Sequence, residues 1–168
     1  MEGKIELEIV TPKGRALLVS CDEVTAPSVA GEFGVMPGHL PLLAAVRTGL
    51  VAYRLGTDQK RCAVSTGFAE AGSNRLLILT EDYIEREGID PVLVRKELAS
   101  VQNEIEKMIQ SVEARDDVGA RKALVERENW LAAQLELYGD PPPATMRPFE
   151  EYSIPATAVV EEEEAAGK

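Results

Sequence analysis

Short runs of strand-forming residues recur about every ten residues through residues 4–80, a spacing typical of a β-sandwich or barrel. In the first run, Ile5, Leu7 and Ile9 alternate with two glutamates, which is the period of a half-buried strand. None of the connections is long enough for the crossover helix that a parallel sheet requires. Residues 1–88 are therefore expected to form an antiparallel β-sandwich of about ten short strands. Further runs are ALLVS, CDEVTA, GLVAYRL, KRCAVS, GFAEA and RLLILT.

The hydrophobic period changes after this region, and residues 89–138 predict two helices. Asp90 is a good N-cap residue, and Pro91 fits the first helical position. The pattern breaks at residues 114–117 and resumes from Val118 to Tyr138. Two helices joined so closely should form an antiparallel hairpin. The first helix has one apolar stripe of Val94, Leu98, Val101, Ile105, Met108 and Val112, and the second has Ala120, Leu124, Leu131, Leu135 and Tyr138.

Residues 139–168 have a different composition. Five of the ten prolines lie here, and two basic against seven acidic residues give 2 − 7 = −5 charges. Such a segment buries too little apolar area to offset its ordering entropy, so we expect a disordered tail. The less favoured alternative is that one sparse apolar group within it docks on another surface: Met146, Phe149, Tyr152 and Ile154.

Charge and cysteine content exclude several classes of function. A formal net charge of −11 disfavours binding to nucleic acid and to anionic lipid. We see neither an apolar run of membrane-spanning length nor a signal peptide, so we expect a soluble protein that is not exported. Cys21 and Cys62 are too few and too far apart for a disulfide framework or a metal site, and are expected to be buried thiols.

The stretch GEFGVMPGHLPLL, residues 31–43, contains the single histidine, His39. No nucleophile elbow or set of metal ligands accompanies this histidine. The glycines fit neither GxGxxG nor a P-loop. Glycine and proline in this arrangement predict a stiff loop with tight turns, and stiff loops with exposed apolar groups suit protein docking. We therefore expect no catalytic residue, no metal site and no cofactor here.

The order of parts and four sequence strings resemble the epsilon subunit of bacterial F-type ATP synthases over about residues 4–138. The strings are GEFGVMPGHLPLL, RTG at 47–49, STGFAE at 65–70 and LLILT at 76–80. The resemblance implies a non-catalytic rotor subunit that couples proton flow to ATP synthesis, peripheral on the cytoplasmic face of the bacterial inner membrane. Its expected partners are the gamma subunit and the polar loops of the c-ring. The docking loop implied by the family places five residues at these contacts: Glu32, Phe33, Gly34, His39 and Leu40.

In the same family, the helical hairpin either lies on the sandwich or extends into the catalytic alpha/beta head and blocks ATP hydrolysis. Some relatives bind ATP through an Ile/Leu-Asp-x-x-Arg-Ala motif. This chain keeps Asp90, but Leu93 occupies the arginine position and Val94 the alanine position. Arg95 comes two residues late, on another face of the helix, so Asp90 and Arg95 are at most a remnant of an ATP site.

Two questions stay open at this point. The second helix balances its basic residues with acidic ones, so whether the hairpin inhibits hydrolysis is undecided. An alternative to the rotor function is an independent β-sandwich module that binds a small ligand, with a nucleotide as the first candidate.

Overall fold

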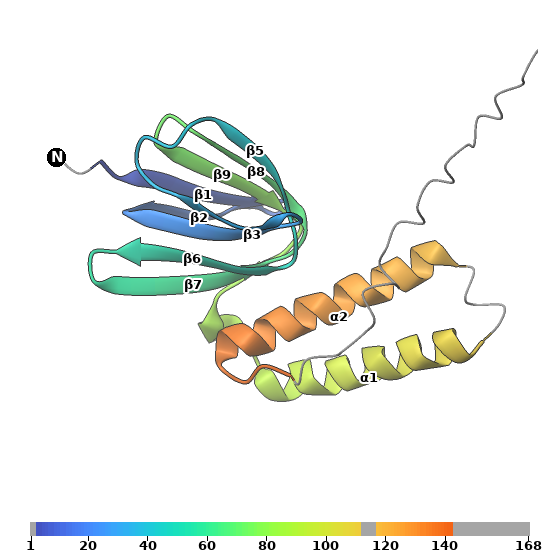
Figure 1. The fold of residues 1–168 in the computed structure, drawn as a ribbon. Helices are drawn as coiled ribbons and strands as arrows, with labels where there is room; N and C mark the ends of the chain where they lie inside the picture. Colours follow the sequence, from blue (N-terminus) through green and yellow to red (C-terminus); the bar gives the residue numbers. More distant parts are fainter. Residues whose placement is uncertain (1–2, 112–116, 143–168) are drawn as a thin grey trace, which may run out of the picture.

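The computed structural model describes residues 3–111 and 117–142 and consists of a β-sandwich followed by a helical hairpin (Figure 1). This architecture confirms the fold class predicted from the sequence. The strands are β1 (Ile5–Thr11), β2 (Gly14–Cys21), β3 (Glu23–Ser28), β4 (Gly31–Val35), β5 (Leu42–Val46), β6 (Gly49–Leu55), β7 (Asp58–Val64), β8 (Gly67–Gly72), β9 (Arg75–Thr80) and β10 (Tyr83–Ile84). A 3-10 turn, η1 (Arg86–Gly88), leads into helices α1 (Pro91–Gln110) and α2 (Val118–Tyr138).

The strands form one continuous hydrogen-bonded sheet that folds over on itself. Their order is β10-β7-β6-β3-β5-β8-β9-β1-β2, and β4 pairs with β3 beside this path. The pairing of β1 with β9 is parallel, whereas the other strand pairs of the described residues are antiparallel. The predicted antiparallel sandwich therefore contains one parallel contact, which brings the N-terminal strand beside the ninth.

Alternating side chains build the core of the sandwich. Ile5, Leu7 and Ile9 are fully buried, while Glu6 and Glu8 on the same strand point outward. Each buried aliphatic side chain of this kind contributes about 1.5–3 kcal/mol through removal from water. Cys21 and Cys62 are also fully buried in this core, as expected for thiols that pack as small hydrophobes.

The helix boundaries follow the predicted capping signals. The Asp90 carboxylate accepts hydrogen bonds from the backbone N–H groups of Val92 and Leu93, at 3.0 and 3.2 Å. The Asp117 side chain accepts one from Ala120 at 2.9 Å, which fixes the start of α2. Gly139 ends α2 with φ +102°, a conformation that favours glycine. In the described part of the chain, neither helix has an apolar stretch long enough to cross a bilayer.

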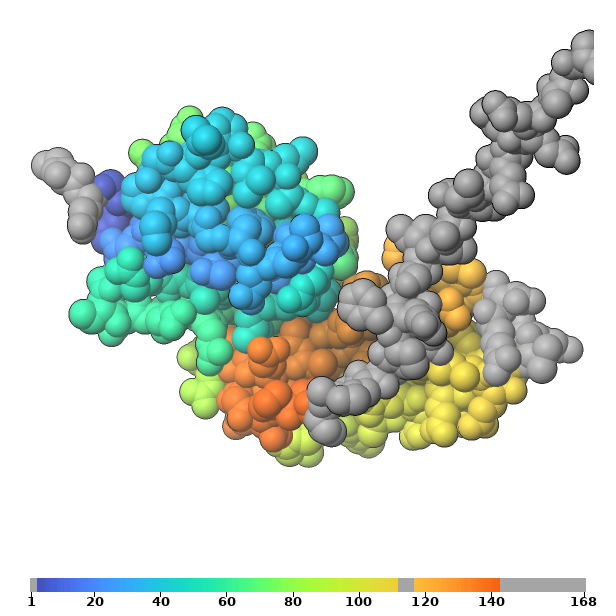
Figure 2. Space-filling view, viewed as in Figure 1, coloured from blue at the N-terminus to red at the C-terminus, as the bar shows by residue number. Residues whose placement is uncertain are grey.

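Helix α2 is sandwiched between α1 and the sheet (Figures 1 and 2). The predicted stripe of α1 is buried at Val94, Leu98, Val101 and Ile105. On α2, Leu131 and Leu135 are buried as predicted, but the structure adds Trp130, Ala133 and Leu137. These side chains join Ala63 and Leu50 of the sheet and Ile84 of β10 in a second apolar cluster. The hairpin is thus folded against strands β6 and β7.

Polar contacts accompany this packing. Gln102 of α1 donates to the buried Glu128 of α2 at 3.2 Å, and Arg127 pairs with Glu97 across the two helices. The Thr48 hydroxyl donates to Glu126 at 3.4 Å and links α2 to the turn between β5 and β6.

Several expectations fall on residues outside those described. They are the final stripe position Val112, the disorder expected beyond Pro142, and the sparse apolar group of Met146, Phe149, Tyr152 and Ile154.

Candidate docking surface

The stretch expected to be a loop at residues 31–43 contains a strand, a tight turn and the start of a second strand. A short turn connects β3 to β4, and the side chain of Ser28 makes two hydrogen bonds within it. Its hydroxyl accepts from the N–H of Ala30 at 3.2 Å and donates to the carbonyl of Gly31 at 2.6 Å. Gly31 has φ +118°, a value that favours glycine. Glu32, opposite Pro27, thereby sits at a fixed register position on β4.

The turn after β4 is fixed by three hydrogen bonds. The N–H of His39 donates to the carbonyl of Met36 at 3.1 Å, and that of Gly38 donates to the side-chain oxygen of Asn74 at 2.7 Å. Asn74 belongs to the β8–β9 turn, so two turns distant in sequence brace each other. The imidazole Nδ1–H of His39 donates to the carbonyl of Leu40 at 2.6 Å. The single histidine thus stabilises the shape of the turn.

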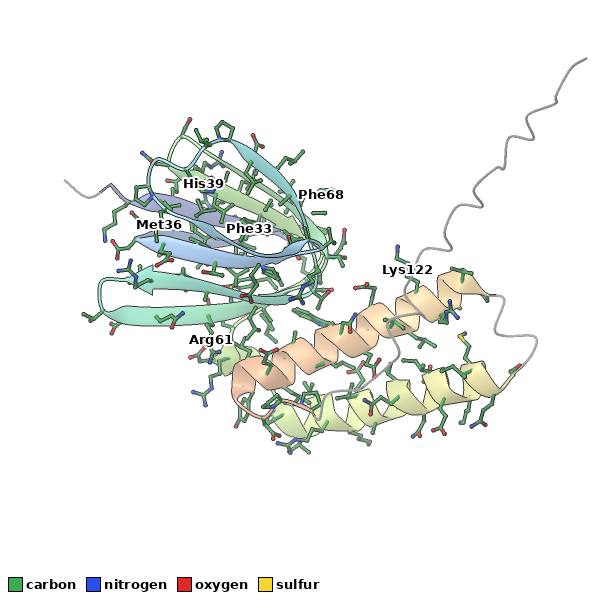
Figure 3. All side chains as sticks on the ribbon, viewed as in Figure 1. Phe33, Met36, His39, Arg61, Phe68 and Lys122 are labelled. Carbon is green, nitrogen blue, oxygen red and sulfur yellow. The ribbon has the colours of Figure 1, made fainter. Side chains whose placement is uncertain are left out.

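The five residues expected at partner contacts differ in exposure. Glu32, Gly34 and Leu40 are exposed, and Leu40 is 78% accessible. Phe33 and His39 are half-buried. Phe33 packs on the sandwich core. Figure 3 shows Met36 and His39 on the side of the sandwich away from the hairpin. The surface formed by Glu32, Gly34, Met36 and Leu40 is called the turn surface below; Met36 is 54% exposed and was not predicted.

A second exposed surface was missed by sequence reasoning. Ala45, Phe68, Leu79 and Val10 are register neighbours across β5, β8, β9 and β1, on the outer side of the sheet. Phe68 is 61% exposed and Leu79 47%. The run LLILT carried the signal, since four consecutive apolar residues in a strand of a sandwich place some of them on the outer face of the sheet. Contiguous exposed apolar side chains mark protein contacts more often than isolated ones do.

The two residues considered as an ATP-site remnant are not brought together. The Asp90 carboxylate caps α1, whereas the Arg95 guanidinium pairs with Asp140 after the end of α2, with Nε–Oδ2 at 2.7 Å. A second contact lies nearby, where the Arg86 guanidinium stacks over the Tyr138 ring at 5.5 Å from its centroid. Asp90 and Arg95 thus have separate structural partners at the base of the hairpin.

The raised pKa values of the cysteine and tyrosine side chains come first from burial in the sandwich. Burial raises the pKa of the Cys62 thiol to about 12, which makes the thiolate nucleophile scarce at neutral pH. Burial and the hydrogen bond to Glu85 raise the pKa of the Tyr83 hydroxyl. Within residues 3–111 and 117–142, no three His, Cys, Asp or Glu side chains are grouped to hold a metal ion. What the exposed surfaces offer is shape and apolar area for binding.

The fold and the two surfaces define a class of protein, in which a β-sandwich with a braced turn has a helical hairpin packed against it. The family model described as the ATP synthase delta/epsilon chain, beta-sandwich domain, matches residues 4–86. An ATP synthase epsilon chain of Anaeromyxobacter dehalogenans is 35% identical over 135 residues, which cover 80% of this chain and 98% of that relative. The chain belongs to the ATP synthase epsilon chain family.

Other similar proteins agree with this assignment. The ATP synthase epsilon chain 1 of Syntrophotalea carbinolica is 41% identical over 90 residues, and the matched stretch spans 54% of this chain but only 65% of that relative. Among solved structures, a chain of the Euglena gracilis mitochondrial ATP synthase matches with a TM-score of 0.66 at 20% identity, covering 80% of each chain. A chain of the Tetrahymena thermophila mitochondrial ATP synthase central stalk and c-ring matches with a TM-score of 0.54 at 16% identity. At these identities the structural likeness concerns the fold.

Proposed function

We propose that this chain is a central-stalk subunit of the rotor of an F-type ATP synthase, which couples proton flow through the c-ring to ATP synthesis in the catalytic head. The observation that carries the proposal is the turn surface, where Leu40 and Met36 are exposed on a turn braced by Asn74. A subunit that transmits torque needs contacts that do not deform, and a turn with few free conformations loses little entropy on binding. The chain itself catalyses no reaction in this proposed function.

The two exposed surfaces suit two kinds of neighbour. Glu32 makes no ion pair with another described residue and is available to basic groups of the c-ring polar loops. Exposed ion pairs contribute about 0–1 kcal/mol, so apolar contacts through Leu40 and Met36 should dominate the affinity. The outer apolar row around Phe68 offers a contact to the gamma subunit. With both neighbours bound, the chain is a peripheral subunit on the cytoplasmic face of the bacterial inner membrane.

The hairpin position described here is proposed to be one of two. In the other, α1 and α2 leave the sandwich and reach the alpha/beta head, where they would block ATP hydrolysis. The folded position depends on the apolar cluster around Leu131 and on few polar links to the sheet, such as Thr48 to Glu126. A small, separate cluster of this kind can open without unfolding the sandwich core. The separate partners of Asp90 and Arg95 count against the nucleotide-binding alternative.

A substitution on the turn surface tests this proposal. Leu40→Asp places a charge on a side chain that is 78% exposed, so the isolated chain should fold normally. Affinity for the complex of gamma subunit and c-ring should fall roughly tenfold or more if Leu40 lies at the centre of the contact. The matched control is Leu93→Asp, on an α1 side chain that is 62% exposed. Equal affinities for the two variants in a pull-down titration would refute the docking role of the turn.

A further inference from the structure

A groove lies between the end of the sandwich and the N-terminal half of α2. Phe68, Leu79 and Val29 line its sandwich side, and Lys122 and Glu126 line its helix side, around a volume of about 700 Å³. Figure 3 shows Phe68 and Lys122 on its two sides. Val29 is 73% exposed and Phe68 61%. Sites of about 300–1,000 Å³ accommodate drug-sized ligands, so this groove has room for several apolar side chains.

The described chain ends beside this groove. Pro141 and Pro142 line a smaller hollow of about 350 Å³ together with Arg47 and Asn129. Glu126 lines both the hollow and the groove, so the two adjoin each other. The segment that follows Pro142 therefore starts next to an unfilled apolar surface.

The sequence after Pro142 contains side chains that suit the groove. Residues 146–154 hold an apolar group of Met146, Phe149, Tyr152 and Ile154. Extended chain spans at most about 3.5 Å per residue, so Phe149 can lie up to about 25 Å from Pro142. A chain tethered so closely has an effective concentration of order millimolar at the groove, and a weak intrinsic affinity is enough for occupancy.

We propose that residues 146–154 of this chain occupy the groove, with Phe149 and Tyr152 against Phe68 and Leu79. The segment carries Arg147 with Glu150 and Glu151, and the groove carries Lys122 with Glu81 and Glu126, so each of the two basic side chains has an acidic partner available. Arg147 can face Glu126, and the carboxylates of residues 150–151 can face Lys122. The segment thereby covers apolar surface that the folded domains leave exposed. This inference goes beyond the rotor function and concerns the chain free of its partners, because the row around Phe68 is also the surface proposed above for the gamma subunit.

A photocrosslink on the full chain tests the proposal. p-Benzoylphenylalanine in place of Phe68 should form crosslinks within one molecule to residues 146–154, mapped by peptide mass spectrometry. The same probe in place of Leu40, on the opposite side of the sandwich, should give few crosslinks to that segment. Crosslinks from Phe68 that avoid residues 146–154, or that join two copies of the chain, would overturn the proposal.

Variants in the segment itself sharpen the test, because they leave the described fold untouched. Phe149→Ser together with Tyr152→Ser should lower the yield of the Phe68 crosslink roughly tenfold, the scale expected when buried aromatic area is removed. Val159→Ser together with Val160→Ser, apolar residues beyond the proposed segment, should leave the yield unchanged. A similar yield from both double variants would contradict docking through Phe149 and Tyr152.

Discussion

At the scale of single residues, Gly67 has the tightest steric constraint among the described glycines. A Cβ at this position would lie 1.8 Å from the carbonyl oxygen of Leu79, on the neighbouring strand. Gly67→Ala must therefore displace backbone, and the free energy of unfolding should fall by roughly 1–3 kcal/mol or more. Urea denaturation measures this change. The control is Gly34→Ala, where the nearest atom to the new Cβ is 4.0 Å away; equal midpoints for the two variants would contradict the steric account.

Cys62 gives the sandwich a specific response to alkaline pH. Burial raises its pKa to about 12 in the folded chain, whereas an unperturbed cysteine ionises at about 8.5. Since the folded pKa is the higher one, the stability from the neutral thiol is complete below about pH 8.5 and is lost as pH rises through the folded pKa. The urea midpoint should fall over this window, and less steeply for Cys62→Ala. Tyr83 keeps part of the slope, because its pKa is raised too; parallel curves for the two proteins would exclude a contribution from Cys62.

At the scale of elements, the sandwich and the hairpin have separate apolar clusters. The sandwich cluster contains strand residues alone, so a chain that ends after Gly88 should remain folded and unfold in one cooperative transition. The truncated chain loses the cover that the hairpin gives to Leu50, Ala63 and Ile84. Circular dichroism during urea denaturation measures this. A truncated chain without a cooperative transition would show that the sandwich depends on the hairpin.

The same truncation tests the proposed second position of the hairpin. ATP hydrolysis by the complete complex should rise when α1 and α2 are absent, because the blocking element is removed. The control is a chain that ends after Pro142 and keeps both helices. Unchanged hydrolysis with the chain ending after Gly88 would remove the inhibitory function while leaving the rotor function intact.

At the scale of the whole molecule, the sequence predicted the fold class and the helix starts, because alternation and capping are local signals. Asp90 was identifiable as a cap from residue type alone, whereas residue type leaves Asp116 and Asp117 as equal candidates for the cap of α2. Strand β4 was missed because its glycines indicate a turn, and only its register with β3 makes it a strand. The burial of Trp130 and Leu137 was missed because α2 has two packed faces, so its apolar residues do not form one stripe.

The candidate docking surface was also predictable only as far as local sequence signals describe it. Glycine and proline positions indicated a stiff segment around His39, and its hydrogen bonds explain that stiffness. The brace from Asn74 and the outer row of Phe68 and Leu79 depend on which strands become neighbours. Such contacts between distant segments are not encoded in a local pattern.

In the proposed rotor function, this chain attaches to the rotor through its sandwich and catalyses no reaction itself. Affinity purification of the tagged full chain from membranes of its own source tests that claim most directly, with quantitative mass spectrometry of the recovered subunits. We expect the gamma subunit and the c-ring subunit to be recovered with the chain, and we expect Leu40→Asp to reduce the amount of both. Recovery of the chain without either subunit, under conditions that keep the ATP synthase intact, would contradict the proposed rotor function.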